Sequence, residues 1–410
     1  MRRVVVTGMG VVSALGTGVR AFAERLHVLQ NAIRVLPDLA GYQGLNAHLG
    51  APVQGFTVPE HFTRKVTRTM GPVSLMAVVS AEEALEQAGL TGDPILQNGR
   101  TGVAYGSSSG SIEPIADFYS MIITHEVRHI TSSTYIKMMP QTCAVNLSLY
   151  FQTVGRLFPT GTACTSGSLA IGQAYEAIKF GLQDVMIAGG AEEFSSTQVA
   201  VFDTLYATST QNDRPERTPA PFDKDRDGLV IGEGAGTLIL EEYEHACRRG
   251  APILAEIVGF GSNTDGTHIT QPTPETMTIA LSEALKDARL NAEDIGYINA
   301  HGTATTQGDI AESQATFTVF GDQTPVSTLK SYVGHTLGAC GGLEAIASVL
   351  MQHEGWFIPN LNLKNVDPAC APLDFIQGQG REIKAPFVMS NNFAFGGINT
   401  SLIFKQIKEE

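Results

Sequence analysis

Short apolar segments recur along the chain and alternate with longer stretches that have the spacing of amphipathic helices. The apolar segments are Val4–Val6, Gly102–Tyr105, Val185–Ala188, Thr237–Leu240, Tyr297–Asn299 and Val326–Leu329. Short apolar runs without a polar face are typical of buried strands, and strands that alternate with helices indicate an α/β protein. The pattern therefore predicts an α/β fold.

The chain divides at about residue 250. The charged stretch Tyr243–Gly250 is followed by a new strand pattern at Ile253–Gly259. We therefore predict an N-terminal half at 1–250 and a C-terminal half at 251–410. No long linker separates them, so we expect one body with a site at the junction. The segment Ile112–Leu149 is rich in Met, Ser and Thr and is predicted to be a less regular insertion or cap.

The charge balance narrows the possible partners. The 410 residues include 27 Lys and Arg against 41 Asp and Glu, a formal net charge of −14. Binding to nucleic acid through a broadly basic surface is therefore not expected. An acidic partner would have to dock on a local basic patch.

The cysteines and the N-terminus indicate a cytoplasmic protein. The five cysteines are odd in number and contain no C-x-x-C pair, so neither a disulfide framework nor a zinc site is indicated. Arg2 and Arg3 precede an apolar stretch, as in a signal peptide, but Gly8 and Gly10 interrupt it too early. No run of about 18 apolar residues occurs, so membrane insertion is not expected.

Two segments imitate ligand-binding motifs. The segment 8–13 follows a strand like a dinucleotide fingerprint, but Ser13 stands where the third glycine is required. The segment 223–228 begins like a calcium loop, but its twelfth position is Gly234 instead of glutamate. We predict a hydrogen-bonded structural turn for the second segment, and neither a nucleotide nor a metal site.

Cys164 is the candidate nucleophile. It lies in Gly161–Ser168, directly before a stretch with helical spacing that runs to Phe180 and stops at Gly181. Unpaired N–H groups at a helix N-terminus favour a thiolate, which predicts a reactive cysteine at neutral pH. A free cysteine is more often a small buried hydrophobe, which is our interpretation of Cys143, Cys247 and Cys370.

Two histidines occur in matching contexts. His301 lies in Asn299–Thr305 and His335 in Lys330–Gly338, each soon after a predicted strand. Such loops meet at one end of a sheet, so both histidines are expected near Cys164. A lone histidine in a glycine-rich loop is more often structural, but two of them beside a candidate nucleophile favour a catalytic site.

Four ordered motifs, together with 221–228, resemble the β-ketoacyl-acyl-carrier-protein synthases over essentially the whole chain. They are TACTSG around Cys164, NAHGT around His301, K-x-x-x-GH at Lys330 to His335, and NNFAFGGIN at 391–399. The similarity is to the elongating Cys-His-His class. It implies the thiolase fold, with two similar halves in five α-β-α-β-α layers, and a decarboxylative Claisen condensation of an acyl group on Cys164 with malonyl-acyl-carrier-protein.

The resemblance also implies roles for individual residues. The backbone N–H groups of Cys164 and Phe395 would form the oxyanion hole, and His301 and His335 would stabilise the enolate. Lys330 would set the local electrostatics with support from Glu344. The pantetheine arm would contact Thr303 and Thr305, and Phe393 and Phe395 would form a gating loop. No cofactor would be bound, since the carrier protein delivers the phosphopantetheine.

The family's partners are acyl carrier proteins and a second subunit. The docking positions that the resemblance implies are Arg64, Lys65, Arg68 and Arg128, although a solvated helix face is the alternative. Gln211 stands at a position that is often basic in the family. The partner subunit would be a second copy, or a chain-length-factor-like subunit without the cysteine.

Two departures bear on the substrate. Ser109 in the turn Gly106–Gly110 replaces a bulky aliphatic residue, which would widen or polarise the acyl tunnel. The segments Phe158–Gly161 and Val201–Ser209 resemble a branch of the family from aryl polyene pathways. A housekeeping fatty-acid elongase is the alternative.

Three other functions compete with condensation. A non-catalytic chain-length partner would lack Cys164. A non-decarboxylating thiolase would use a second cysteine near the C-terminal loop, and neither Cys340 nor Cys370 lies in such a motif. A cysteine hydrolase would not need two histidines that stabilise an enolate.

Overall fold

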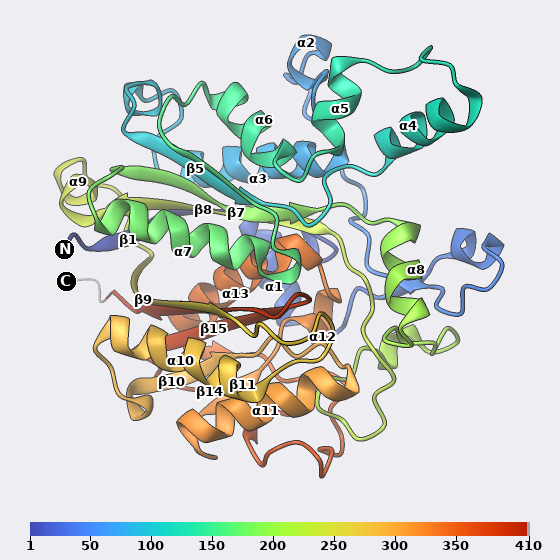
Figure 1. Cartoon of the computed structure of the whole chain (residues 1–410). Helices are drawn as coiled ribbons and strands as arrows, with labels where there is room; N and C mark the ends of the chain where they lie inside the picture. The colour runs from blue at the N-terminus through green and yellow to red at the C-terminus, as the bar shows by residue number, and fades with distance from the viewer. Residues whose placement is uncertain (408–410) are drawn as a thin grey trace.

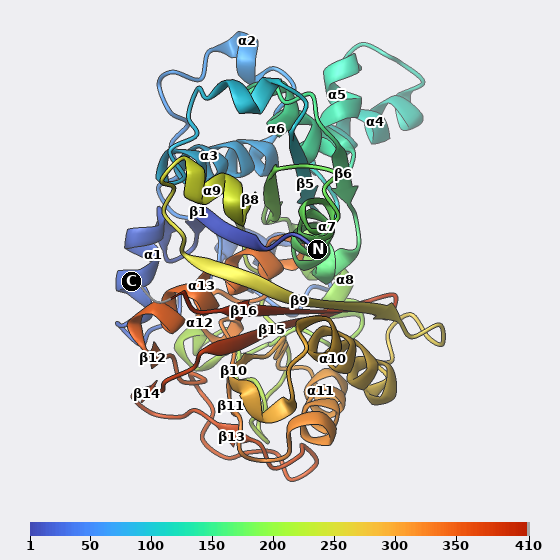
Figure 2. The ribbon, with the colours of Figure 1, turned by 90° about the vertical axis from the view of Figure 1, so that its left-hand side faces the viewer.

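The structure, a computed structural model that describes residues 1–407, consists of two stacked β-sheets with helices between and outside them (Figures 1 and 2). Helix α3 (Pro72–Gln87) covers the outer face of one sheet. Helices α10 (Pro274–Ala288) and α11 (Thr306–Phe320) cover the other. Helices α7 (Ser166–Lys179) and α13 (Cys340–Glu354) pack against each other between the sheets. These are the five predicted layers.

The two halves repeat one strand order. The N-terminal strands are β1 (Val4–Ser13), β5 (Thr101–Gly106), β6 (Leu157–Thr160), β7 (Val185–Glu192) and β8 (Gly234–Glu242). The C-terminal strands are β9 (Ala255–Thr264), β10 (Ile295–Asn299), β11 (Pro325–Ser327), β15 (Phe387–Ala394) and β16 (Ile398–Lys405). When the five strands of each half are numbered 1 to 5 in chain order, their order across the sheet is 3-2-4-5-1 in both halves. This is the predicted thiolase fold.

The two sheets meet at a short seam. Strand β1 pairs with β9 through Val4–Val6, while most of β1 pairs with β8. The predicted boundary at 250 lies between α9 (Tyr243–Arg248) and β9, and the division of the chain there stays a prediction. Within residues 1–407, no helix is both long and apolar enough to cross a membrane.

The glycines of the first motif serve packing. All ten residues of β1 are buried, and α3 crosses them at close range. A Cβ at Gly8 would lie 2.0 Å from the carbonyl oxygen of Ala84, and one at Gly10 would lie 1.8 Å from that of Ser80. Only glycine permits this approach. The segment that imitates a nucleotide fingerprint is therefore a strand packed under a helix.

The calcium-like segment is a structural turn, as predicted. The carboxylate of Asp223 accepts hydrogen bonds from the backbone N–H groups of Asp225, Lys364 and Asn365. Asp223 therefore joins this turn of the N-terminal half to the loop of the C-terminal half that contains Lys364 and Asn365.

Three sequence-based predictions need correction. The predicted cap contains α4 (Glu113–Thr124) and α5 (Ser132–Met138). Its last part, however, is α6 (Thr142–Phe151), which packs on α3. This helix belongs to the core, because its residues Ala144 and Leu147 are buried. Strand β11 ends at Ser327 instead of Leu329. Cys247 is exposed on α9, while Cys143 and Cys370 are buried as predicted.

Candidate active site

Cys164 lies at the junction of the two halves. Strand β6 ends at Thr160, a single 3-10 turn at Ala163–Thr165 follows, and α7 begins at Ser166. The side chain of Ser166 fixes the turn, because its hydroxyl accepts a hydrogen bond from Thr162 N (2.9 Å) and donates one to the carbonyl of Ala163 (2.7 Å). Cys164 is only 4% exposed. The predicted position at the start of the helix is confirmed.

His335 contacts the candidate nucleophile directly. Its Nε2 lies 3.0 Å from Cys164 Sγ. The backbone N–H of Leu337 donates to His335 Nδ1 at 3.2 Å, so Nδ1 is an acceptor and the proton of the neutral ring lies on Nε2. His335 therefore presents an N–H donor to the space around the sulfur.

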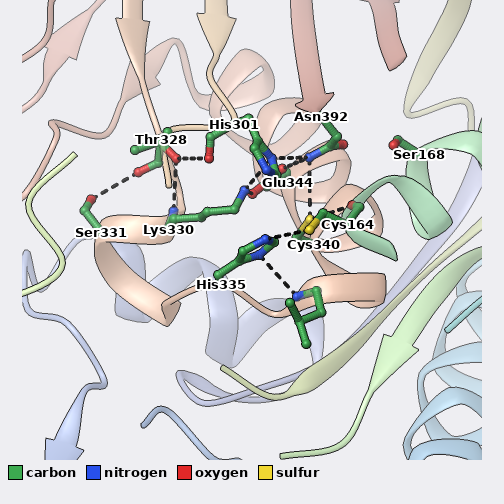
Figure 3. Close-up of polar contacts among 12 residues, drawn as sticks. Cys164, Ser168, His301, Thr328, Lys330, Ser331, His335, Cys340, Glu344 and Asn392 are labelled. Carbon is green, nitrogen blue, oxygen red and sulfur yellow. Dashed lines mark hydrogen bonds and ion pairs between the residues drawn. The ribbon is translucent and has the colours of Figure 1, made fainter. Parts of the chain in front are cut away.

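His301 has the same tautomer as His335, but different residues fix it. Lys330 Nζ and Asn392 Nδ2 approach its Nδ1 at 3.0 and 3.3 Å. Both are donors, so the proton of His301 also lies on Nε2. The two imidazole rings meet edge to face with centroids 5.1 Å apart. Figure 3 shows the long Lys330 side chain reaching toward His301, while His335 approaches Cys164 from the other side.

The three side chains are close enough to suggest a metal site. The sulfur of Cys164 and one ring nitrogen from each histidine all lie within 4.8 Å of one another. A metal would need the lone pair of the nitrogen that faces the sulfur, and a metal-bound histidine normally donates its other ring N–H. Here the other ring nitrogens accept hydrogen bonds instead. The donor set therefore suits hydrogen bonding to a substrate oxygen better than metal coordination.

A buried ion pair supports His301. Lys330, in the short helix α12 (Lys330–Val333), donates to Glu344 Oε1 at 2.5 Å, and Asn392 Nδ2 donates to Glu344 Oε2 at 2.6 Å. Burial disfavours the Lys330 ammonium, but attraction to Glu344 and its hydrogen bond, together with Cys340 and Glu312, outweigh this effect, and the pKa of Lys330 lies above its usual value. The lysine therefore stays charged beside His301.

Removing Lys330 should destabilise the protein strongly. In the Lys330→Met variant, Glu344 is left as an unpaired buried carboxylate, and we expect a loss of about 3–5 kcal/mol in the free energy of unfolding, measured by urea denaturation. Lys330→Met/Glu344→Leu removes both charges and should recover part of this loss. Equal destabilisation in the single and double variants would contradict the role of the ion pair.

The thiol is not activated in the way that the sequence predicted. Burial raises the pKa of Cys164 to about 11, although Lys330 and the backbone N–H groups of Phe395 and Cys164 itself lower it. The helix terminus therefore does not outweigh desolvation, and at neutral pH the resting group is a thiol. Burial, with the charge of Lys330, also holds the pKa values of His301 and His335 well below the usual value, so both rings are neutral.

This correction has a measurable consequence. Since alkylation requires the thiolate, the iodoacetamide labelling rate of Cys164 should rise about tenfold per pH unit between pH 7 and 10. Peptide mapping separates this label from that on the exposed Cys247. A rate for Cys164 that is already constant at pH 8 would show a low thiol pKa, as the sequence had suggested.

A cavity of about 340 Å³ leads to the three side chains. Thr303, Thr305, Phe393 and Phe395 line it, and the hydroxyls of Thr303 and Thr305 are 2.8 Å apart. The aromatic ring of Phe395 packs on Phe202 of α8 (Ser196–Thr204). Of the predicted substrate-contacting residues, only Ser109 does not line this cavity. Its hydroxyl donates to the buried Glu192 at 3.2 Å.

The predicted docking residues lie elsewhere. Arg64 and Lys65 are in α2 (Arg64–Thr67) with Arg68 directly after it, and all three are exposed. Arg128 lies in the loop between α4 and α5, where it pairs with Glu126 at 3.2 Å. In both views α2 is at the top of the molecule, whereas α8, which borders the cavity, lies at about mid-height (Figures 1 and 2).

Three residues at the site had no predicted role. Asn392 binds Glu344 and approaches His301. Glu312 accepts hydrogen bonds from the backbone N–H groups of His301 and Gly302, both at 2.7 Å. Burial raises the pKa of Glu312 to about 8. Cys340 donates its S–H to the carbonyl of Cys164 at 3.1 Å. The one feature of the sequence that could have indicated a residue of this group is the polar pair Asn391-Asn392 inside an otherwise apolar strand pattern.

The fold and the buried Cys-His-His arrangement define a thiolase-fold acyltransferase. Comparison with known proteins agrees: residues 1–246 match the N-terminal domain and residues 254–364 the C-terminal domain of beta-ketoacyl synthases. The chain belongs to the β-ketoacyl synthase family.

Relatives match the whole length of the chain. The 3-oxoacyl-[acyl-carrier-protein] synthase 2 of Vibrio cholerae is 38% identical, with 99% of each chain covered. The crystal structure of a beta-ketoacyl synthase from Burkholderia phymatum is 58% identical, with a TM-score of 0.98 and 100% of each chain covered. The ishigamide ketosynthase/chain length factor is 30% identical, with a TM-score of 0.90, 99% of this chain and 100% of that chain covered.

Proposed function

We propose that this chain extends an acyl group by decarboxylative condensation with malonyl on an acyl carrier protein. The observation that carries the proposal is a pair of neutral histidines, each with its proton on Nε2, whose rings meet beside a buried cysteine at the end of a cavity. Two donors beside an acylated sulfur are suited to an enolate oxygen. The relative from Vibrio cholerae bears the name of this activity.

In the first half-reaction, the sulfur of Cys164 attacks the thioester carbonyl of an acyl group on the carrier's phosphopantetheine. The backbone N–H groups of Cys164 and Phe395, which are both directed at the sulfur, would donate to the oxygen as negative charge develops on it. The thioester bond to the pantetheine breaks, and its sulfur leaves with the proton from Cys164. The acyl group is then held on Cys164.

In the second half-reaction, malonyl on a carrier protein enters the same cavity. Loss of carbon dioxide leaves an enolate, whose oxygen accepts hydrogen bonds from the Nε2–H groups of His301 and His335. The enolate carbon attacks the acyl carbonyl, the bond to Cys164 breaks, and the sulfur recovers a proton. The product is a 3-oxoacyl group on the carrier protein.

Two features favour assembly with a second subunit. Strand β6 is the open edge of the described sheet, and Leu157 and the nearby Val154 are exposed there. Exposed strand edges with apolar side chains are typical interface positions. The partner is a second copy or, as in the ishigamide ketosynthase/chain length factor, a related subunit. The basic residues of α2 would serve an acidic carrier protein in that assembly.

Intact-protein mass spectrometry tests the proposed function. The enzyme is incubated with carrier proteins that bear saturated, polyenoyl or 4-hydroxybenzoyl-derived groups, and then with malonyl-carrier protein. We expect the mass of one acyl group on the enzyme, which is lost when malonyl-carrier protein is added and the extended product forms. Preference for a saturated chain would indicate fatty-acid elongation, and preference for a conjugated chain would indicate polyene formation. An adduct that malonyl-carrier protein does not discharge would contradict condensation.

A further inference from the structure

The buried carboxylate of Glu192 joins three segments behind the active site. Glu192 is the last residue of β7 and is completely buried. Its Oε2 accepts hydrogen bonds from the backbone N–H groups of Ser108 at 2.8 Å and Gly338 at 2.9 Å. Its Oε1 accepts from the side chains of Ser107, Ser109 and Gln198, at 3.3, 3.2 and 3.5 Å. One carboxylate therefore ties the turn 106–110 and helix α8 to the turn that follows His335.

The turn after His335 contains a strained residue. Leu337 begins the 3-10 turn Leu337–Ala339, and its φ of 46° lies in the left-handed region, which leucine rarely adopts. Such a conformation persists only where the surrounding structure holds it. The next residue, Gly338, is closely enclosed, since a Cβ there would lie 2.7 Å from Glu192 Oε2 and 2.8 Å from Ser108 N. Glu192 supplies the side-chain hydrogen bond that holds this turn.

The strained residue also fixes the proton of His335. The N–H of Leu337 donates to His335 Nδ1, and this hydrogen bond leaves the ring proton on Nε2. The backbone of His335 itself is fixed by a different segment. Its N–H donates to the carbonyl of Val230 at 2.7 Å, and its carbonyl accepts from the N–H of Gly232 at 2.9 Å. The direction of the Leu337 N–H therefore depends on the turn that Glu192 binds.

We propose that Glu192 is a positioning residue for condensation, because it holds the turn 337–339 so that the Leu337 N–H meets His335 Nδ1. The inference rests on the proposed function, in which the Nε2–H of His335 donates to the enolate oxygen. This role needs an acceptor at the position of Oε2 and does not need a charge. The partners of Oε1 are hydroxyl and amide groups, which can turn to accept a hydrogen bond. The reach of the side chain is therefore what matters.

Two substitutions at Glu192 separate reach from charge. Glu192→Gln keeps the length and one acceptor oxygen, whereas Glu192→Asp keeps the charge but is one methylene shorter. Misplacing a reacting group is costly, so we expect acylated Glu192→Asp to react with malonyl-carrier protein about 10–10²-fold more slowly than wild type. Acylation of Glu192→Asp, and both half-reactions of Glu192→Gln, should stay within about threefold of wild type. Single-turnover mass spectrometry measures each half-reaction.

Nitrogen NMR of isotope-labelled histidine reports the position of the His335 proton directly, with His335→Gln as the assignment control. Wild type and Glu192→Gln should carry the proton on Nε2, and Glu192→Asp should show a mixture with Nδ1. Glu193→Asp is the matched variant. Glu193 is also buried and accepts from two backbone N–H groups, but these belong to Val73 in α3 and Ile112 before α4. Glu193→Asp should change neither the His335 resonances nor the condensation rate.

The other outcomes overturn the assignment. Slow condensation by Glu192→Gln with normal condensation by Glu192→Asp would show that the charge acts and the reach does not. Wild-type rates in both variants, an equal loss in Glu193→Asp, or slow condensation with the His335 proton unchanged would also exclude positioning through the turn. Failure of the wild-type enzyme to condense would instead contradict the proposed function.

Discussion

Replacing Cys164 with alanine should abolish acylation and reduce condensation by on the order of 10⁴-fold or more. The variant keeps the cavity and both histidines but has no atom that can hold the acyl group. The readout is the mass of the enzyme after incubation with acyl-carrier protein, together with the rate of formation of the 3-oxoacyl product.

Cys247→Ala is the control, because Cys247 is exposed on α9 and outside the cavity lining. It should acylate and condense at the wild-type rate. If Cys164→Ala still acquired the acyl mass, another side chain would be the nucleophile. Cys340 would then be the first to test, since it lies against the carbonyl of Cys164.

The His335→Ala variant should lose condensation by about 10²–10⁴-fold while keeping part of its self-acylation. The ring supplies one of the two N–H groups proposed for the enolate oxygen. The oxyanion donors of the first half-reaction are backbone groups that the substitution leaves in place. Single-turnover mass spectrometry separates the two half-reactions.

The His335→Gln variant tests the assigned tautomer. Glutamine has a side-chain N–H donor of similar reach but cannot act as a base near neutral pH. Partial recovery of condensation relative to His335→Ala would support a donor role, and no recovery would favour proton transfer by His335. Normal condensation by His335→Ala would contradict the mechanism.

The main residues of the candidate site could be predicted because each lies in a locally distinctive segment. Cys164 stands where an apolar strand gives way to small residues and a helix, and His301 and His335 follow strands in glycine-rich loops. Asn392 and Glu312 were not assigned, because the role of a polar residue in a strand or a helix cannot be predicted until its hydrogen-bond partners are known.

The state of the thiol illustrates the limit of local reasoning. A helix N-terminus favours the thiolate, and this much follows from the sequence around Cys164. The raised pKa follows from burial by segments that are distant along the chain, including α13 and the turn after β15. Desolvation depends on how completely water is excluded, which no single segment determines.

The sequence by itself determined the α/β class and identified the candidate nucleophile, both histidines and the lysine, since turns, strand ends and helix starts depend on neighbouring residues. Only the tertiary structure decided that His335 contacts Cys164 while Lys330 holds His301, and that both histidines carry their proton on Nε2. These relations join segments far apart in the chain, and their distances are fixed by the packing of two sheets around α7 and α13.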